Sequence, residues 1–236
     1  MGCGQTQVVV CSSGTAALHL VLESLSLSPG DEVLTADFNM IAVPRAISLA
    51  GLTPILCDCD DRLLMDLDMA EDALRERHGR IKAILAVHIY GRRLDMDALA
   101  ELAGKYQCLL IEDMSELHGV PVHPRTDAAC WSFYLNKIVH GEEGGCIAFR
   151  DTQTASARRA RQLRNLAFTE AHDFRHLPRG HNYRLADLLA TSILESLRRI
   201  EDNLEKRREI EGWYSTCSPT AWMMPPRDVV WVYDLR

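Results

Sequence analysis

The sequence lacks the long apolar runs that a membrane span requires. A transmembrane helix needs about 20 consecutive, predominantly apolar residues, and no stretch of that kind occurs in the 236 residues. Internal repeats and low-complexity segments are missing as well. These absences exclude a helical membrane protein and a repeat architecture, and they predict no membrane partner.

Positive charge is also scarce. The chain has 26 Lys and Arg against 33 Asp and Glu, for a net charge of −7. Its densest basic group is Arg158, Arg159, Arg161 and Arg164, which lies on a predicted helix and fits a solvated face better than a phosphate-backbone contact. We therefore expect no nucleic-acid partner.

Paired metal-ligand cysteines are missing too, although the chain has eight cysteines. Cys57-Asp58-Cys59 has neither the spacing nor the second ligand pair of a zinc site. Most cysteines fall in apolar predicted strands and are expected to be reduced core residues of a cytoplasmic protein. These are Cys11, Cys57, Cys59, Cys108, Cys130 and Cys146.

The chain does contain a regular alternation of strand and helix patterns. With 47% hydrophobic residues, it can bury one sizeable core. Strands are predicted near 7–11, 32–36, 53–57, 82–87, 108–112, 129–134 and 145–149, and helices near 15–26, 40–50, 68–78, 94–106, 152–166 and 185–213. A final strand is predicted over Val229–Val232. This order predicts a three-layer α/β/α fold with a mostly parallel central sheet.

One lysine has a distinctive position. Lys137 follows an apolar, aromatic strand and precedes a glycine-bearing turn at 141–145, which holds its amine near the interior, where loss of water favours the neutral form. A neutral amine attacks aldehydes to form a Schiff base, so Lys137 is a candidate for carrying pyridoxal phosphate. A solvated loop lysine is the alternative interpretation.

Two further positions fit such a cofactor. Ser12-Ser13-Gly14-Thr15 follows a strand and opens a helix, so it offers N–H groups and hydroxyls to an anion, although ordinary helix caps use the same residues. Asp113 ends a buried strand, where ligands bind in α/β sheets. Facing a pyridine nitrogen, Asp113 would keep the ring protonated and electron-withdrawing; it could equally cap a helix.

Seven stretches in this order resemble the DegT/DnrJ family of pyridoxal-phosphate-dependent sugar aminotransferases. The resemblance runs from about residue 5 to the C-terminus. The matching stretches are Ser12–Leu18, Gly30–Val33, Val87–Gly91, Ile111–Asp113, Ser132–Tyr134 with Lys137, Glu143–Gly145, and His181–Arg184. The fold that this resemblance implies is the large domain of fold-type I transferases.

The resemblance also implies roles for single residues. Lys137 would form the Schiff base and then act as general base and general acid, and Asp113 would pair with the pyridine nitrogen. Gly14 and Thr15 would bind the phosphate, assisted by the Ser132 hydroxyl.

Three more cofactor contacts follow from the same resemblance. Glu116 would lie near the phenolic oxygen of the cofactor. Asn182 would reach the phosphate of the neighbouring subunit, which makes a homodimer with shared active sites the expected unit; helix-entry chemistry is the alternative for Asn182. Met40 stands where the family usually stacks an aromatic ring, and its sulfur can pack on a π face with less overlap.

Other departures from the family pattern affect the turn after the lysine and the chain ends. Glu142 replaces a glycine and His140 replaces a small hydroxyl residue. The resemblance implies a large domain over 1–213, while 214–236 would begin a small C-terminal domain that is mostly absent, as is an N-terminal arm. A short natural form, a truncated product and a fragment are all compatible with that expectation.

The predicted activity is transfer of an amino group, from glutamate or a similar donor, to a keto group of a nucleotide-linked deoxysugar or a cyclitol. Such reactions serve polysaccharide or antibiotic biosynthesis. One alternative is a pyridoxamine-phosphate-dependent dehydratase, but those relatives carry histidine in place of Lys137. The other is a shortened, non-catalytic dimer partner.

The N-terminus offers one competing motif. Met1–Thr6 fits a myristoylation pattern, with Cys3 placed for palmitoylation. Only a few residues separate this segment from a strand that we expect in the core, so lipidation is the less favoured interpretation.

Overall fold

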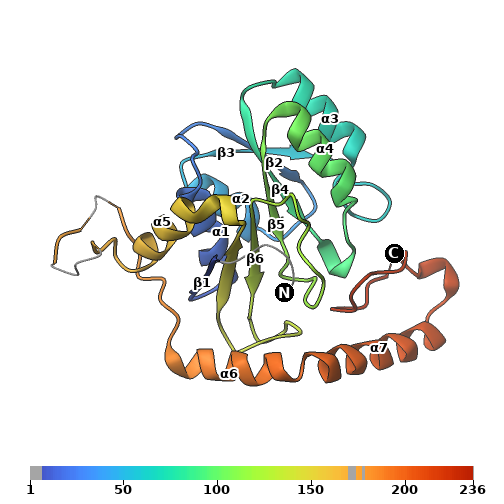
Figure 1. Ribbon diagram of the computed structural model, residues 1–236. Coiled ribbons are helices and arrows are strands. Elements are labelled where there is room, and N and C mark those ends of the chain that lie inside the picture. Colours follow the sequence, from blue (N-terminus) through green and yellow to red (C-terminus); the bar gives the residue numbers. More distant parts are fainter. Residues whose placement is uncertain (1–6, 170–173, 177–178, 236) are drawn as a thin grey trace.

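The computed structural model describes residues 7–169, 174–176 and 179–235 as one seven-stranded sheet flanked by helices (Figure 1). The acylation pattern at residues 1–6 lies outside these residues. The strands are β1 (Gln7–Cys11), β2 (Glu32–Ala36), β3 (Thr53–Cys57), β4 (Ile81–Val87), β5 (Leu109–Asp113), β6 (Ala128–Ser132) and β7 (Gly145–Phe149). All seven predicted sheet strands are thus confirmed to within two residues.

The sheet has the order β1-β7-β6-β5-β4-β2-β3. The pairs β6–β5, β5–β4, β4–β2 and β2–β3 are parallel, whereas β7 runs antiparallel to both β6 and β1. The predicted mostly parallel sheet is therefore confirmed. Because parallel strands end at one edge, the carboxyl ends of β4, β5 and β6 lie together there.

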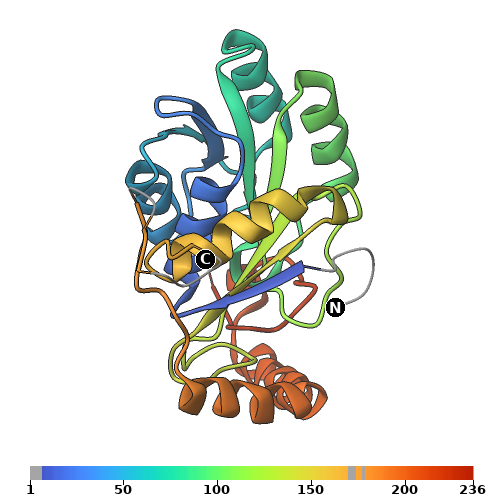
Figure 2. The same ribbon diagram turned by 60° about the vertical axis from the view of Figure 1, so that its left-hand side comes forward.

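Helices cover both faces of the sheet. Their bounds are α1 (Gly14–Ser24), α2 (Ala42–Leu49), α3 (Leu67–Glu76), α4 (Met96–Tyr106), α5 (Thr154–Arg164), α6 (Asp187–Arg198) and α7 (Ile200–Cys217). α1, α2 and α5 pack together on one face and α3 and α4 on the other, as Figure 1 shows. In the turned view of Figure 2, α5 lies beside the edge strand β1.

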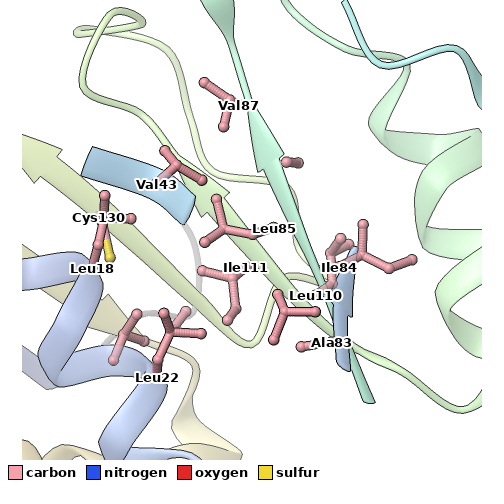
Figure 3. Close-up of a cluster of buried hydrophobic side chains, with 14 of the residues drawn as sticks. Leu18, Leu22, Val43, Ala83, Ile84, Leu85, Val87, Leu110, Ile111 and Cys130 are labelled. Carbon is pink, nitrogen blue, oxygen red and sulfur yellow. The ribbon is translucent and has the colours of Figure 1, made fainter. Parts of the chain in front are cut away.

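The main core lies between the sheet and α1. Leu18 and Leu22, four residues apart and so on one face of the helix, lie against Ile111 and Cys130 of the sheet in Figure 3. All four side chains are at most 3% exposed. Burying each large apolar side chain contributes about 1.5–3 kcal/mol, so this layer fixes α1 against the strands that carry the site.

The sheet alternates between two cores. In β6, Ala128 and Cys130 belong to the main cluster, while Ala129 and Trp131 belong to a second one on the opposite face. This is the two-residue period of a strand. The second cluster is covered by the α6–α7 region through Ile193, Leu197, Ile200 and Leu204.

The long C-terminal helix predicted over 185–213 is interrupted in the structure. Arg199 has φ −106° and ψ 22°, outside helical values, and separates α6 from α7. The two helices run one after the other along one end of the molecule in Figure 1. The apolar repeat continues across the break, which is why periodicity alone did not reveal it.

The predicted strand at Val229–Val232 is wrong. This segment forms no ladder; instead the N–H groups of Asp228 and Val229 both donate to the Gly91 carbonyl at 2.9 Å, and Trp231 N–H donates back to Val229 at 3.1 Å. A Cβ at residue 91, where φ is +77°, would lie 1.8 Å from the Val229 carbonyl oxygen. Only glycine allows this crossing.

The same C-terminal segment surrounds a buried arginine. The Arg92 side chain is fully buried, and its guanidinium donates to Asp234 Oδ1 at 2.8 Å and to the Pro225 carbonyl at 3.1 Å. A buried cation requires such partners. The segment after α7 is therefore fastened to the loop that follows β4.

The seven described cysteines are free thiols. Cys11, Cys57, Cys130 and Cys146 are buried as expected, whereas Cys59 and Cys108 are half-buried and Cys217 is exposed. Burial raises the pKa of the Cys11 thiol to about 12, so this thiol stays protonated. No helix in the described part of the chain has the length and apolar character to cross a bilayer.

Candidate active site

A cavity of about 510 Å³ opens at the carboxyl ends of β4, β5 and β6, beside the N-terminus of α1. Seven of the eight residues predicted from the sequence line it. They are Gly14, Thr15, Met40, Asp113, Glu116, Ser132 and Lys137. The topology thus collects residues that are up to 123 positions apart into one site of ligand-binding size.

Lys137 is presented by a folded loop between β6 and β7. Phe133 N–H donates to the Gly144 carbonyl at 2.8 Å and Leu135 N–H to Glu142 at 3.1 Å, while Gly141 N–H returns to Phe133 at 2.9 Å. The Lys137 side chain is only 11% exposed. Its amine is therefore held at the cavity and is not a solvated loop lysine.

Glu116 faces this amine. Its Oε1 lies 3.3 Å from Lys137 Nζ, and its Oε2 accepts the Tyr90 N–H at 2.6 Å. Burial raises the pKa of the Glu116 carboxyl, and the Lys137 charge works in the opposite direction. Tyr90 has φ +52°, a conformation that costs energy for a tyrosine, and the Glu116 contact stabilises it.

Asp113 ends β5 and is 7% exposed. One carboxylate oxygen accepts the Ser115 N–H at 2.9 Å. Asp113 does not cap a helix, because residues 114–117 form a turn and no helix follows β5 directly. The carboxylate is therefore oriented at the cavity wall.

A buried pair of side chains supports the strand ends behind Asp113. His88 Nε2 donates to Glu112 Oε2 at 3.0 Å, and both side chains are fully buried. Leu94 N–H donates to His88 Nδ1 at 3.3 Å, which places the ring proton on Nε2. Burial acts to raise the pKa of Glu112, but bonds from His88, Thr126 and His123 hold it below its ordinary value.

The α1 N-terminus forms the opposite wall. The Ser13 hydroxyl accepts the Ala16 N–H at 3.1 Å, as an N-cap does, and the first N–H groups of a helix have no partner within it. A Cβ on Gly14 would lie 2.6 Å from the Ser132 Cβ. Glycine therefore lets the helix end approach β6 and brings Gly14, Thr15 and Ser132 to one anion-binding corner.

Two predicted residues are less enclosed. Met40 lines the cavity but is 65% exposed. Asn182 is exposed, pairs with Asn165 in an isolated bridge, and does not line the cavity. The expectation that Asn182 serves a neighbouring subunit stays a prediction.

Trp231 is one of the cavity residues that are not among those predicted from the sequence. Lys137 Nζ lies 3.6 Å from the centroid of its indole ring, a cation–π arrangement, and the indole N–H donates to the Asn136 carbonyl at 2.9 Å. The sequence pattern places Trp231 in the predicted strand over Val229–Val232. The sequence offers one signal against a strand here. Pro225-Pro226 lie shortly before Trp231 and make a strand ladder difficult to continue.

The donor set fits pyridoxal phosphate. A primary amine, a carboxylate at a strand end and a helix N-terminus with a hydroxyl all line one cavity. These groups match the aldehyde, the ring nitrogen and the phosphate of that cofactor. Lys137, Asp113 and the Gly14–Ser132 corner would hold it.

Comparison with known proteins gives an independent result. The model of the DegT/DnrJ/EryC1/StrS aminotransferase family matches residues 2–217. GDP-perosamine synthase of Caulobacter vibrioides is 33% identical over 99% of this chain and 66% of its own length. The dTDP-3-amino-3,4,6-trideoxy-alpha-D-glucose transaminase of Micromonospora megalomicea is 34% identical over 89% of this chain and 57% of its own length.

Solved structures agree in fold. The chain matches ntda from Bacillus subtilis with bound cofactor PMP at a TM-score of 0.86 and 27% identity, over 96% of this chain and 54% of that one. It matches S. venezuelae DesV in complex with a ketimine intermediate at 0.82 and 29%, over 97% and 63%. The chain therefore spans just over half to about two thirds of the proteins that it matches.

Proposed function

The chain belongs to the DegT/DnrJ/EryC1/StrS aminotransferase family, and from this premise we propose that it is a pyridoxal-phosphate-dependent aminotransferase. The observation that carries the proposal is the single cavity lined by Lys137, Asp113 and the α1 N-terminus. We propose an amino-acid donor such as glutamate. The acceptor would be a keto group on a nucleotide-linked deoxysugar or a cyclitol.

The names of the relatives support the acceptor class. One is a GDP-perosamine synthase and another is a transaminase of a dTDP-linked trideoxyglucose. Both are named for amino sugars on a nucleotide carrier. Because the chain spans 66% and 57% of their lengths, the acceptor remains a proposal.

When bound, pyridoxal phosphate supplies an aldehyde that captures amines and a ring that withdraws electrons from the adjacent carbon. The chain contributes the groups around it. Asp113, oriented by Ser115, would hold a proton on the ring nitrogen. Gly14, Thr15 and Ser132 would hold the phosphate at the positive end of α1.

Lys137 provides the amine for covalent attachment and, once free, a base that can take up and return a proton at Nζ. Glu116 lies 3.3 Å from Nζ, so it can hold the protonated amine in place. The Trp231 ring, whose centroid lies 3.6 Å from Nζ, shields the amine from water. Glu116 and Trp231 together limit the groups with which Nζ can exchange this proton.

Two further expectations remain predictions. A homodimer with shared active sites accounts for the exposed position of Asn182, outside the cavity of its own chain. A cytoplasmic location accounts for the buried, unpaired thiols, because reducing compartments keep thiols free.

The first test is spectroscopic. Purified protein with added pyridoxal phosphate is expected to absorb in the visible, and borohydride reduction should fix the cofactor mass on the peptide that carries Lys137. Lys137→Ala should abolish both signals, because the attacking amine is gone. Lys105→Ala, which removes an exposed lysine paired with Glu71, is the matched control and should keep both. A wild-type protein that stays colourless in excess cofactor would instead support the non-catalytic dimer partner.

The second test addresses Asp113. We expect Asp113→Asn to bind the cofactor but to react with glutamate about 10- to 150-fold more slowly, the rate equivalent of a charged hydrogen bond worth about 1.5–3 kcal/mol. Stopped-flow loss of the visible band measures that rate. Unchanged kinetics would rule out the electron-withdrawing role.

The acceptor can be found directly. Protein converted to the pyridoxamine form is mixed with a panel of nucleotide-linked keto sugars and keto cyclitols. The compound that restores the aldehyde spectrum identifies the acceptor class. If none restores it while glutamate converts the protein, the acceptor proposal fails but the cofactor proposal stands.

A further inference from the structure

A second group of chemically active side chains lies on α1, further along the helix from the active site. His19 and Glu23 are four residues apart on the helix, and His181 approaches them from the segment before α6. One nitrogen or oxygen atom from each of the three lies within 4.8 Å of the others. Among the described residues no other such group of three possible metal ligands occurs.

The hydrogen bonds of this cluster leave one of its buried nitrogen atoms without a partner among the described residues. His181 Nε2 pairs with Glu23 Oε2 at 2.6 Å, but His19 Nε2 is 3.8 Å from Glu23 Oε1. The His19 side chain is 6% exposed, and its buried Nε2 has no hydrogen-bond partner within the described chain. Leaving such an atom unpaired costs about 1–3 kcal/mol.

The other ring nitrogen of His19 is already held. His19 Nδ1 lies 3.2 Å from the Tyr183 hydroxyl. If Nδ1–H donates to that oxygen, the Nε2 lone pair points at the cluster; an orienting hydrogen bond of this kind is typical of metal-ligating histidines.

We infer that His19 Nε2, Glu23 and His181 Nε2 form a binding site for one divalent ion of the zinc type. Two imidazoles and one carboxylate are a ligand set that zinc accepts, with a fourth position left for water. Tetrahedral ligands lie about 3.4 Å apart when each is about 2.1 Å from the ion. The His19–Glu23 contact at 3.8 Å would close to that separation, and the His181–Glu23 contact at 2.6 Å would open to it.

The location gives such an ion a structural consequence. Ser12 N–H, in the anion-binding turn, donates to the Tyr183 carbonyl at 2.9 Å, and His181 N–H donates to Leu163 at 2.7 Å. An ion on His181 and His19 would fasten the 181–183 segment to α1. It would thereby steady both the turn at Ser12 and the exposed Asn182.

Calorimetric titration of the metal-stripped full chain with zinc chloride tests the inference. We use a Cys217→Ser background, because an exposed thiol can itself bind zinc. The expected result is one ion per chain. Glu23→Gln and His181→Gln should each weaken binding more than about 100-fold, beyond the 10- to 100-fold expected when a supporting group such as Tyr183 is lost in Tyr183→Phe. His78→Gln, which removes an exposed histidine, should change nothing.

Two other measurements test whether the ion is bound at this cluster. Cobalt bound at the site should give visible bands without a thiolate charge-transfer band. Zinc should raise the Tm of the wild type but not that of His181→Gln, because only a site present in the folded state stabilises it. Both partly exposed positions are chosen so that the variants fold.

Either of two outcomes would overturn the inference. One is the absence of zinc binding to the wild type, which would leave a hydrogen-bonded histidine–glutamate pair only. The other is zinc binding to Glu23→Gln and His181→Gln that is as strong as zinc binding to the wild type. Cofactor colour is measured separately on metal-free protein, so failure here leaves the proposed activity untouched.

Discussion

Two histidine–glutamate pairs in this protein differ in how completely their atoms are paired. His88 and Glu112 are fully buried, and Thr126 and His123 supply the remaining bonds to Glu112. In the His19–Glu23–His181 cluster, a buried nitrogen is left over. The comparison teaches that two buried histidine–glutamate groups can differ in unused bonding capacity, which burial by itself does not reveal.

The strongest test removes the glutamate from each pair. Glu112→Ala leaves His88, the Thr126 hydroxyl and the His123 N–H buried without their hydrogen-bond partner. We therefore expect the unfolding free energy to fall by about 3–5 kcal/mol. Glu23→Ala in metal-free protein should cost at most about 1 kcal/mol, because the pair is partly solvated. Urea unfolding monitored by circular dichroism measures both.

Equal losses from the two variants would erase the distinction. Should Glu112→Ala fail to fold, Glu112→Gln preserves the shape and one acceptor oxygen. It should remain folded but less stable than the wild type.

A test with a smaller expected effect removes one hydroxyl group that contacts each pair. Thr126→Val takes away a 2.5 Å bond to the buried Glu112 carboxylate and should cost about 1.5–3 kcal/mol, the range for bonds to charged groups. Tyr183→Phe removes the 3.2 Å contact to the neutral ring of His19 and should cost about 0.5–1.5 kcal/mol.

The chain offers a matched control for the threonine. Thr35 is fully buried but its hydroxyl has no partner among the described residues. Thr35→Val should therefore leave the denaturation midpoint unchanged or raise it. A loss as large as that of Thr126→Val would show that volume, and not the bond to Glu112, sets the effect.

The smallest effect concerns pH. The pKa of Glu112 is below its ordinary value of 4.5 in the folded chain, so between pH 4.5 and that lower value the unfolded chain binds a proton that the folded chain does not. The stabilisation from Glu112 is complete above pH 4.5 and is lost as the pH falls through the folded pKa, with a slope of at most about 1.4 kcal/mol per pH unit.

Glu112→Gln removes this titration. The difference in stability between wild type and variant, measured by urea unfolding at stepped pH, should therefore shrink only below pH 4.5. A difference that stays constant down to pH 3 would mean that the pKa of Glu112 is the same in the folded and unfolded chains.

Much of the fold was predictable because its signals are local. The apolar run Val8–Cys11 followed by Ser12–Thr15 marks a strand, a cap and a helix within a few residues, and the structure confirms each. The break at Arg199 was not predictable, since the apolar period continues through it. The reversed direction of β7 depends on which strands pair, which spacing does not encode.

The residues of the two sites also divide into those whose proximity the sequence could predict and those whose proximity it could not. Lys137 and Asp113 follow strands, and parallel strand ends must meet, so their proximity could be predicted. Trp231 reaches the cavity through the crossing of Val229 over Gly91, a contact between segments more than a hundred residues apart. His19 lies within the apolar helix α1, and only the tertiary fold brings His181 to it.

The setting of Arg92 has a practical consequence for handling this protein. Its guanidinium cannot lose its charge, and its partners Asp234 and Pro225 come from residues beyond the end of the family match at 217. A version trimmed at that boundary would retain a permanent cation and lose the anion that neutralises it. The tail is therefore a counter-ion built into the chain, and shortening it would remove part of the electrostatic balance of the domain.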